Sequence, residues 1–191
     1  MPDISWITPK VAIGSEPSAS WVSAMRTQGI TDVLDLRGEP RAREVAEPEL
    51  YAGTPIRYHY LPMLDRGGRE PVEAYVRGVQ IIDCAVRSGG KILVHCAAGI
   101  SRSPSMVYAY LRSIRESSRA EAWEQIRSRR RVASQQYFDS ADAALPQIAP
   151  VTDCAPVLQT PSSASDNTTA FVVAGVILLG GLSFWYYRTR R

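Results

Sequence analysis

The chain has 191 residues, of which 45% are apolar and 21% charged, a length and composition that suit one globular domain with a single core. Its formal net charge of +3 comes from Arg188, Arg190 and Arg191, because the 19 basic and 19 acidic residues before them cancel. A nucleic-acid-binding domain would carry a basic excess in its folded part, so no nucleic-acid partner is expected.

Short apolar segments alternate with amphipathic segments along the first 145 residues. Strands are predicted at Val11–Ser15, Thr31–Leu36, Ile56–Leu61 and Lys91–His95. Helical spacing of apolar residues predicts helices at Ser18–Gln28, Pro71–Arg87, Ser103–Arg115, Arg119–Arg131 and Gln136–Leu145. The alternation predicts an α/β fold, with a central and mostly parallel sheet of four to five strands flanked by helices on both faces.

The composition changes after Leu145, which divides the chain into a domain at 1–148 and a Pro/Ser/Thr-rich linker at 149–169. Residues 170–187 carry no charge and end in Trp185, Tyr186 and Tyr187, as an interfacial aromatic belt would. As a helix they would be about 27 Å long, close to the roughly 30 Å of a bilayer core. A buried core helix would show a polar face, so a transmembrane helix is the prediction, followed by a basic tail at 188–191.

The first residues show neither a basic segment nor an apolar signal segment, so the domain is expected on the cytosolic side of a single-pass tail anchor. The target would be the mitochondrial outer membrane or endoplasmic reticulum in a eukaryote, and the inner membrane in a bacterium. The three cysteines are scattered and odd in number, which favours free thiols in a reducing compartment. Cys84 is then a core residue and Cys154 a linker residue, with a redox partnership of Cys84 and Cys96 as the lesser alternative.

The segment "GGKILVHCAAGISRSPSMVYAYL" (89–111) reads as a strand, a turn of small residues and a helix. Such a turn directs successive backbone N–H groups into one concavity at the positive end of the helix, where an anion binds. The candidate phosphate cradle consists of Ala97, Ala98, Gly99, Ile100, Ser101 and Arg102. Cys96 at its floor would be held as the thiolate and would act as a nucleophile.

Three neighbours of Cys96 have candidate roles. The planar guanidinium of Arg102 can bind two phosphate oxygens at once and stabilise the transferring group. Ser103 can donate a hydrogen bond to the sulfur, which helps the thiolate leave a phosphocysteine. His95 is interpreted as an organiser of the loop rather than as a base.

The order His-Cys, two residues, Gly, two residues, Arg-Ser resembles the signature of the protein tyrosine phosphatase superfamily, and "VHCAAGISRSPSMVYAYL" is similar to its dual-specificity branch. The resemblance extends from Ile4 to Ile148. It departs from the family at "ASQQYF", where a Pro-Asn pair usually precedes the aromatic residue of the last helix. It implies a monomeric phosphatase that hydrolyses protein phosphotyrosine and phosphoserine/threonine through a phosphocysteine, without cofactor or metal.

Family members place an aspartate, the general acid, about thirty residues before the cysteine. Asp65 lies 31 positions before Cys96 and beside Gly67 and Gly68, which would let its loop move, so Asp65 is the candidate general acid. Asp35, at a strand end, and Asp83, in a helical pattern, are more simply explained as a cap and as part of a solvated face.

The substrate depends on the cradle and its surroundings. The cradle has no lysine, unlike that of phosphoinositide phosphatases in the superfamily, so a phosphorylated protein is the expected substrate. A phosphoinositide or another non-protein phosphoester is one alternative, and a catalytically silent module that binds phosphoresidues is another. The run Arg127–Arg131 is interpreted as a solvated face, or else as a collector of anions.

Overall fold

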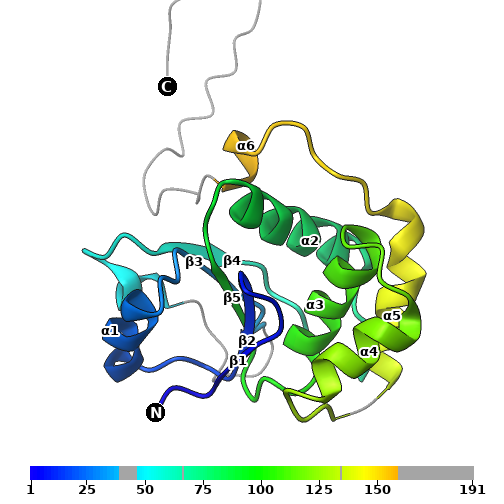
Figure 1. Cartoon of the computed structure of the whole chain (residues 1–191), viewed down its shortest axis with the longest axis horizontal. Helices are drawn as coiled ribbons and strands as arrows, with labels where there is room; N and C mark the ends of the chain where they lie inside the picture. The colour runs from blue at the N-terminus through cyan, green and yellow to red at the C-terminus, as the bar shows by residue number, and fades with distance from the viewer. Residues whose placement is uncertain (39–46, 66, 134, 159–191) are drawn as a thin grey trace, which may run out of the picture. The chain divides into compact units, whose positions relative to one another are not determined.

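Five short strands form one sheet in the computed structural model, which describes residues 1–38, 47–65, 67–133 and 135–158. In chain order the strands are β1 (Ile4–Trp6), β2 (Val11–Gly14), β3 (Asp32–Asp35), β4 (Arg57–Tyr60) and β5 (Ile92–His95). The spatial order is β1-β2-β5-β3-β4, with β1 antiparallel to β2 and every other neighbouring pair parallel (Figure 1). The carboxyl ends of β2, β3 and β5 therefore meet at one edge, around His95.

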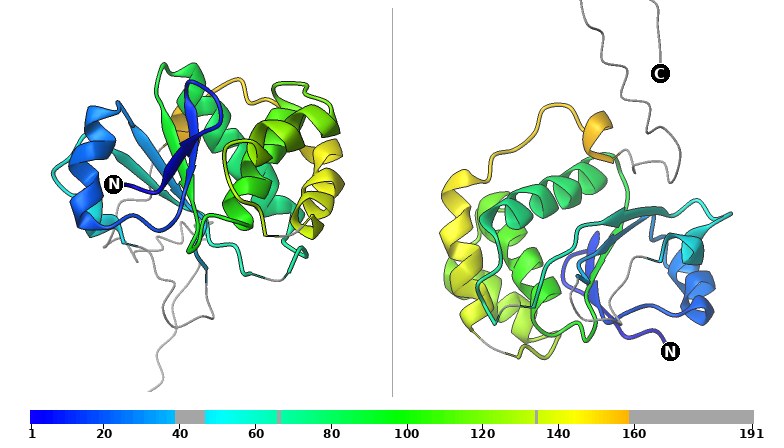
Figure 2. Two further views of the ribbon diagram at one scale, coloured as in Figure 1. Left: turned by 60° about the horizontal axis from the view of Figure 1, so that its bottom comes forward. Right: turned by 180° about the vertical axis from the view of Figure 1, so that it is seen from behind.

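Helices cover both faces of this sheet, as the alternation predicted. One face carries α1 (Ala19–Thr27) and the short 3₁₀ helix η1 (Pro48–Tyr51). The other carries the larger helical layer, formed by α2 (Val72–Arg87), α3 (Arg102–Ser113), α4 (Arg119–Arg127) and α5 (Gln136–Ala144) (Figures 1 and 2). A 3₁₀ turn, η2 (Leu145–Gln147), and the four-residue α6 (Ala155–Leu158) end the described chain.

Strand β5 shows why the core strands have no polar face. Leu93 packs into the cluster beneath α1, whereas Ile92 and Val94 pack into the cluster beneath α2 and α3. Successive side chains of a strand point to opposite faces, and here both faces are covered, so every residue of β5 is buried. The continuous apolar run in the sequence is the signature of this central position.

The four predicted strands and five predicted helices are confirmed, with shifted ends. The strand β1 and the helix α6 were not predicted, since neither three nor four residues show a usable period. Helix α4 begins with a capping box between Ser118 and Glu121, and it ends at Arg127 rather than at Arg131. The chain turns after Ser128, and this turn takes Arg130 away from the solvated helix face.

Residues 149–158, predicted as the start of a linker, pack against α2 instead. Cys154 forms a disulfide with Cys84 across a Cα–Cα distance of 5.3 Å, and Val157 is buried. The prediction of free thiols is therefore wrong for these two residues, and so is the pairing of Cys84 with Cys96, which remains a free, buried cysteine. Sequence spacing missed the bridge because its two halves lie 70 residues apart.

The predicted transmembrane segment, 170–187, lies outside the described residues. Among the described residues, no helix has both the length and the apolar character needed to cross a bilayer.

Candidate active site

A tight loop, Cys96–Arg102, joins the end of β5 to the start of α3; it is called the cysteine loop below. Its turn depends on Gly99, which has a φ of +67°. A Cβ at this position would lie 2.5 Å from the carbonyl oxygen of Gly14, too close for any side chain. The strand, turn and helix predicted from the sequence are thus present, with a glycine where both backbone angle and space require one.

Cys96 lies at the floor of this loop, and the residue is 1% exposed. The Gly99 N–H donates to Sγ at 3.3 Å, and the Ser103 hydroxyl oxygen lies 3.4 Å from Sγ. Hydrogen-bond donors to sulfur stabilise the thiolate more than the thiol. Of the predicted neighbours, Ser103 lies at the sulfur, together with the Gly99 amide.

Arg102, the first residue of α3, is held rigidly beside the cysteine loop. Its side chain is 2% exposed, and Nη1 donates to the carbonyl oxygens of Met63 at 3.0 Å and Leu36 at 3.4 Å. Its Nη2 lies 3.9 Å from Oδ2 of Asp65. The guanidinium is fixed by contacts from two other loops before any ligand arrives, which reduces the reorganisation needed to bind an anion.

Asp65 approaches the cysteine loop from a segment called the Asp65 loop, which consists of the described residues 61–65, 67 and 68. The Tyr137 hydroxyl, from the first turn of α5, donates to Oδ1 of Asp65. The Asp65 side chain is 21% exposed, so this carboxylate stands at the mouth of the site rather than in the core. The tertiary structure thus brings Asp65 beside Arg102 at the end of the cysteine loop, where Cys96 and Ser103 are in contact with each other.

His95 lies behind the cysteine loop and is fully enclosed. Its Nε2 is 3.6 Å from Oδ1 of Asp35, and its carbonyl oxygen accepts from the Leu36 N–H. Burial lowers the pKa of His95 to about 4, although the Asp35 carboxylate acts in the opposite direction. The ring is therefore neutral near pH 7, which suits an organising residue better than a proton donor.

Both rival aspartates are buried, so the solvated face proposed for Asp83 is wrong. Asp35, the last residue of β3, does cap the end of its strand, because its Oδ1 accepts from the Arg37 N–H at 2.9 Å. Asp35 is paired with Arg37 at 2.7 Å and accepts from the Tyr58 hydroxyl at 2.7 Å. Asp83, 4% exposed in α2, lies 3.4 Å from Arg87. Both carboxylates are engaged in ion pairs of the framework.

Arg130 is a residue of the site that sequence reasoning missed. It was grouped with the exposed arginines of the Arg127–Arg131 run, yet it is only 8% exposed. Its Nε donates to the carbonyl oxygen of Gly99, and its Nη2 pairs with Asp3 at 2.7 Å. No local signal separates one arginine of such a run from the others, because its partners lie 31 and 127 residues away.

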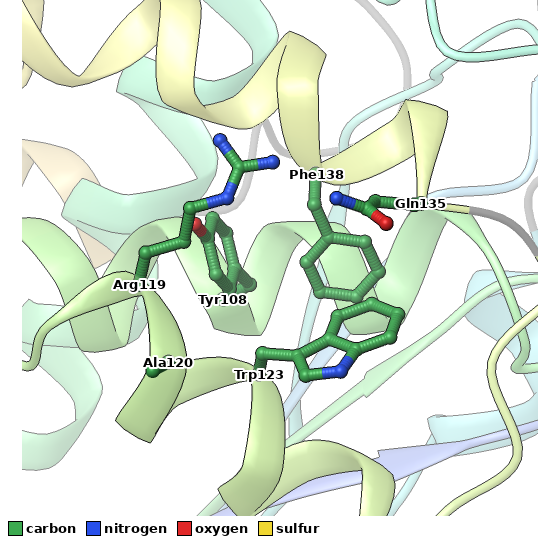
Figure 3. Close-up of a pocket in the computed structure, with 6 residues that line it drawn as sticks. All are labelled: Tyr108, Arg119, Ala120, Trp123, Gln135 and Phe138. Carbon is green, nitrogen blue, oxygen red and sulfur yellow. The ribbon is translucent and has the colours of Figure 1, made fainter.

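A separate aromatic cavity of about 310 Å³ lies among α3, α4 and the start of α5 (Figure 3). The Phe138 ring meets Trp123 and Tyr108 edge to face at centroid distances of 4.8 and 4.7 Å, and Arg119 stands at the rim. None of the residues that line it belongs to the cysteine loop or the Asp65 loop. The described residues also contain no cluster of three or more His, Cys, Asp and Glu that could hold a metal.

Comparison with known proteins assigns the chain to a family. Residues 11–139 match the family model described as dual specificity phosphatase, catalytic domain. The chain is 33% identical to dual specificity protein phosphatase 5 of Rattus norvegicus over 128 residues, which cover 67% of this chain and 31% of that protein. It is 31% identical to dual specificity protein phosphatase 26 of Homo sapiens over 133 residues, which cover 69% and 62%. It thus spans about a third and about three fifths of the lengths of these two relatives.

Solved structures support the same fold. The human tyrosine phosphatase-like serine/threonine/tyrosine-interacting protein superposes with a TM-score of 0.65 at 24% identity, covering 75% of this chain and 95% of that one. The protein titled PTPMT1 superposes with a TM-score of 0.67 at 22% identity, covering 75% and 94%. With a matching family model over more than half of its length and a cysteine loop of the expected geometry, the chain belongs to the dual specificity phosphatase family.

Proposed function

We propose that the chain is an active, cysteine-dependent phosphatase that hydrolyses phosphomonoesters of proteins. The observation that carries the proposal is the meeting of a buried thiol, a fixed guanidinium and a partly exposed carboxylate around one loop. A silent binding module needs the anion cradle but neither the nucleophile nor the acid. The presence of all three groups in reach of one another favours catalysis.

In the proposed first step, the Cys96 thiolate attacks phosphorus, the S–P bond forms and the bond from phosphorus to the leaving oxygen breaks. Asp65 gives its proton to that oxygen, so the alcohol or phenol leaves neutral. Water then attacks the phosphocysteine while Asp65 takes a proton from it. The S–P bond breaks, Ser103 stabilises the departing thiolate and inorganic phosphate is released.

Contacts of the loop carbonyls support its use as a phosphate cradle. The carbonyl oxygens of Ala97, Gly99 and Ile100 accept from the surrounding framework, namely from Glu16 N–H, Arg130 and Ala133 N–H. With these carbonyls turned outward and the Gly99 N–H donating to Cys96 Sγ, the other amides of residues 97–101 and the Arg102 guanidinium can donate to phosphate oxygens.

We propose phosphotyrosine and phosphoserine/threonine in proteins as the substrates. Support comes from the absence of lysine in the cradle and from the Glu16 carboxylate at its edge, where the Glu16 N–H donates to the Ala97 carbonyl oxygen. Glu16, which follows β2, pairs with Arg37 at 2.7 Å, and its side chain is 41% exposed. A carboxylate at this edge disfavours a polyanionic lipid headgroup more than a phosphopeptide.

A substrate panel tests this proposal. The full chain should hydrolyse p-nitrophenyl phosphate, and then phosphotyrosyl and phosphothreonyl peptides with a higher kcat/KM than soluble phosphoinositides. Binding of phosphopeptides without release of phosphate would support the silent module instead. A higher kcat/KM on phosphoinositides would move the substrate to lipids.

We further propose that residues 170–187 anchor the chain in a membrane, with the phosphatase domain on the cytosolic side. The support is their lack of charge over 18 residues and their aromatic end. The proposed target is the mitochondrial outer membrane or endoplasmic reticulum in a eukaryote and the inner membrane in a bacterium. The argument from free thiols for a reducing compartment no longer applies, because Cys84 and Cys154 are bridged.

Carbonate washing and protease protection test the anchor and its orientation. The full chain should stay in the membrane fraction, a chain truncated after Thr160 should not, and protease should reach the domain only from the cytosol. Release of the full chain by carbonate would rule out a span, and protection of the domain would reverse the orientation.

A further inference from the structure

The first turn of α5 lies directly against the Asp65 loop, at the point where the sequence departs from the family pattern. Gly68, with a φ of +91°, packs so closely on Gln136 that a Cβ would lie 2.8 Å from the Gln136 carbonyl carbon. Two residues further along, the Ser140 hydroxyl donates to the carbonyl oxygen of Glu70 at 3.2 Å. Helix α5 is therefore the surface on which the Asp65 loop rests.

Tyr137 contacts the Asp65 carboxylate directly from this surface. Its hydroxyl donates to Oδ1, while Oδ2 of the same carboxylate faces Nη2 of Arg102 at 3.9 Å. The two oxygens are thus differentiated, one held by α5 and the other directed to the place where a bound phosphate would sit. A carboxylate that could rotate freely would not keep this distinction.

The Tyr137 side chain is itself well fixed. The residue is 7% exposed, and its backbone carbonyl accepts from the Tyr75 hydroxyl at 3.2 Å, which in turn lies 3.1 Å from Ser105 Oγ in α3. Burial, followed by the hydrogen bond to Asp65, raises the pKa of Tyr137 to about 12. The phenol keeps its proton over the whole working range of pH and remains a donor.

We propose that Tyr137 is a positioning residue for the general acid, acting on the reaction through Asp65; the proposal rests on the phosphatase activity proposed above. With Oδ1 bound to Tyr137, the proton is carried on Oδ2. As the bond from phosphorus to the leaving oxygen breaks, this proton passes to the leaving oxygen and Asp65 becomes a carboxylate. The Tyr137 hydrogen bond strengthens at that moment, because a charged acceptor binds a donor more tightly than a neutral one.

Substrates that differ in their leaving group separate this role from mere packing. A leaving group that is more acidic than phenol, such as p-nitrophenol, needs less help from a proton donor, whereas phenol depends on the general acid. The value of kcat/KM reports the steps up to the phosphocysteine, where the leaving group departs. The full chain is compared with Tyr137→Phe, Asp65→Ala and the double variant, on p-nitrophenyl phosphate and on phenyl phosphate.

Tyr108→Phe is the matched control, because its hydroxyl also donates to a carboxylate, that of Asp142 at 2.8 Å, but away from the Asp65 loop. Both phenylalanine variants keep the ring and its packing. Thermal unfolding of each variant establishes that it is folded before its kinetics are compared.

Tyr137→Phe should lower kcat/KM for phenyl phosphate about tenfold, which is less than the loss expected when the acid itself is removed. For p-nitrophenyl phosphate, kcat/KM should fall less than about twofold. In the Asp65→Ala background it should lower neither further. Tyr108→Phe should not change the ratio between the two substrates.

Equal losses on both substrates, or the same loss with and without Asp65, would overturn the role of Tyr137. If Asp65→Ala shows the leaving-group dependence and Tyr137→Phe does not, only the Tyr137 proposal fails. If the unmodified chain hydrolyses neither ester, the proposed function fails first and this proposal falls with it.

Discussion

The cysteine loop and the Asp65 loop are the two halves of the site, and they are held in opposite ways. The cysteine loop is continuous with β5 and α3, and its Cys96 is 1% exposed in the main core. The Asp65 loop lies on the surface of α5, and its carboxylate is 21% exposed. The first is fixed by strand, helix and buried hydrogen bonds. The second is tied to the end of β3 and to Arg102 through Leu61 and Met63, whereas its Asp65 end is held by Tyr137 of α5.

This difference suits the chemistry proposed for each loop. A nucleophile and its anion cradle work best when they are preorganised, since reorganisation during the reaction would raise the barrier. An acid has to meet leaving groups of different shapes and let the product out, which a loop with glycines at its end allows. Variants that damage one loop should therefore have a different kinetic signature from variants that damage the other.

The largest expected effect comes from removing the nucleophile. Cys96→Ser should lower kcat by about 10⁴-fold or more, because a hydroxyl in this cradle is not ionised. Binding of a phosphopeptide should survive, since Arg102 and the loop amides remain. Phosphate release and peptide binding are measured on the same preparation, and turnover above a few per cent of the unmodified chain would exclude Cys96 as the nucleophile.

Removing the acid comes next and should depend on the leaving group. Asp65→Ala should lower kcat/KM for phenyl phosphate by about 10²–10⁴-fold, the usual contribution of a general acid, and for p-nitrophenyl phosphate by much less. It should also abolish the basic limb of the pH–rate profile. A profile that keeps its shape in the variant would place the acid elsewhere.

A smaller effect should follow from loosening the cysteine loop through Arg130. Arg130→Lys keeps the charge but cannot bind both Gly99 and Asp3 with one planar fork, so kcat/KM should fall about tenfold. In contrast to Tyr137→Phe, the loss should be the same for both esters. Arg129→Lys, in the exposed neighbour, is the control, and an equal loss there would show that the effect does not depend on the contacts of Arg130 with Gly99 and Asp3.

The smallest effect concerns stability and pH. The pKa of His95 is about 4 in the folded chain and about 6.5 when unfolded, so below pH 6.5 the unfolded state gains a proton that the folded state does not. The stability contribution is complete above pH 6.5 and is lost as the pH falls toward 4. Between pH 7 and pH 5 this removes about 2 kcal/mol of unfolding free energy.

Urea unfolding of the unmodified chain and of His95→Asn at both pH values measures this difference. The variant should be less stable at pH 7 but should lose about 2 kcal/mol less on acidification. The same pH dependence in both proteins would show that the histidine is not buried in the neutral form.

Contiguous sequence determined the nucleophile side of this protein. The apolar run of β5, the small residues after Cys96 and the helix that begins at Arg102 are neighbours in the chain, and local geometry follows from local residues. The central strands and main helices were predictable for the same reason, since the spacing of apolar residues within each segment indicates its secondary structure. Asp65 was placed by the resemblance to a family rather than by any local period.

Tertiary structure alone decided which distant residues complete the site. Arg130 reaches Gly99 across 31 residues, Tyr137 reaches Asp65 across 72, and Cys154 is bridged to Cys84 across 70. From the sequence, Arg130 was interpreted as part of a solvated face and Cys154 as a linker residue. Tyr137 was only an aromatic residue in the segment that departs from the family pattern. Their partners are set by how α4, α5 and the segment after them pack on the sheet layer, and packing of that kind has no period to be read along the chain.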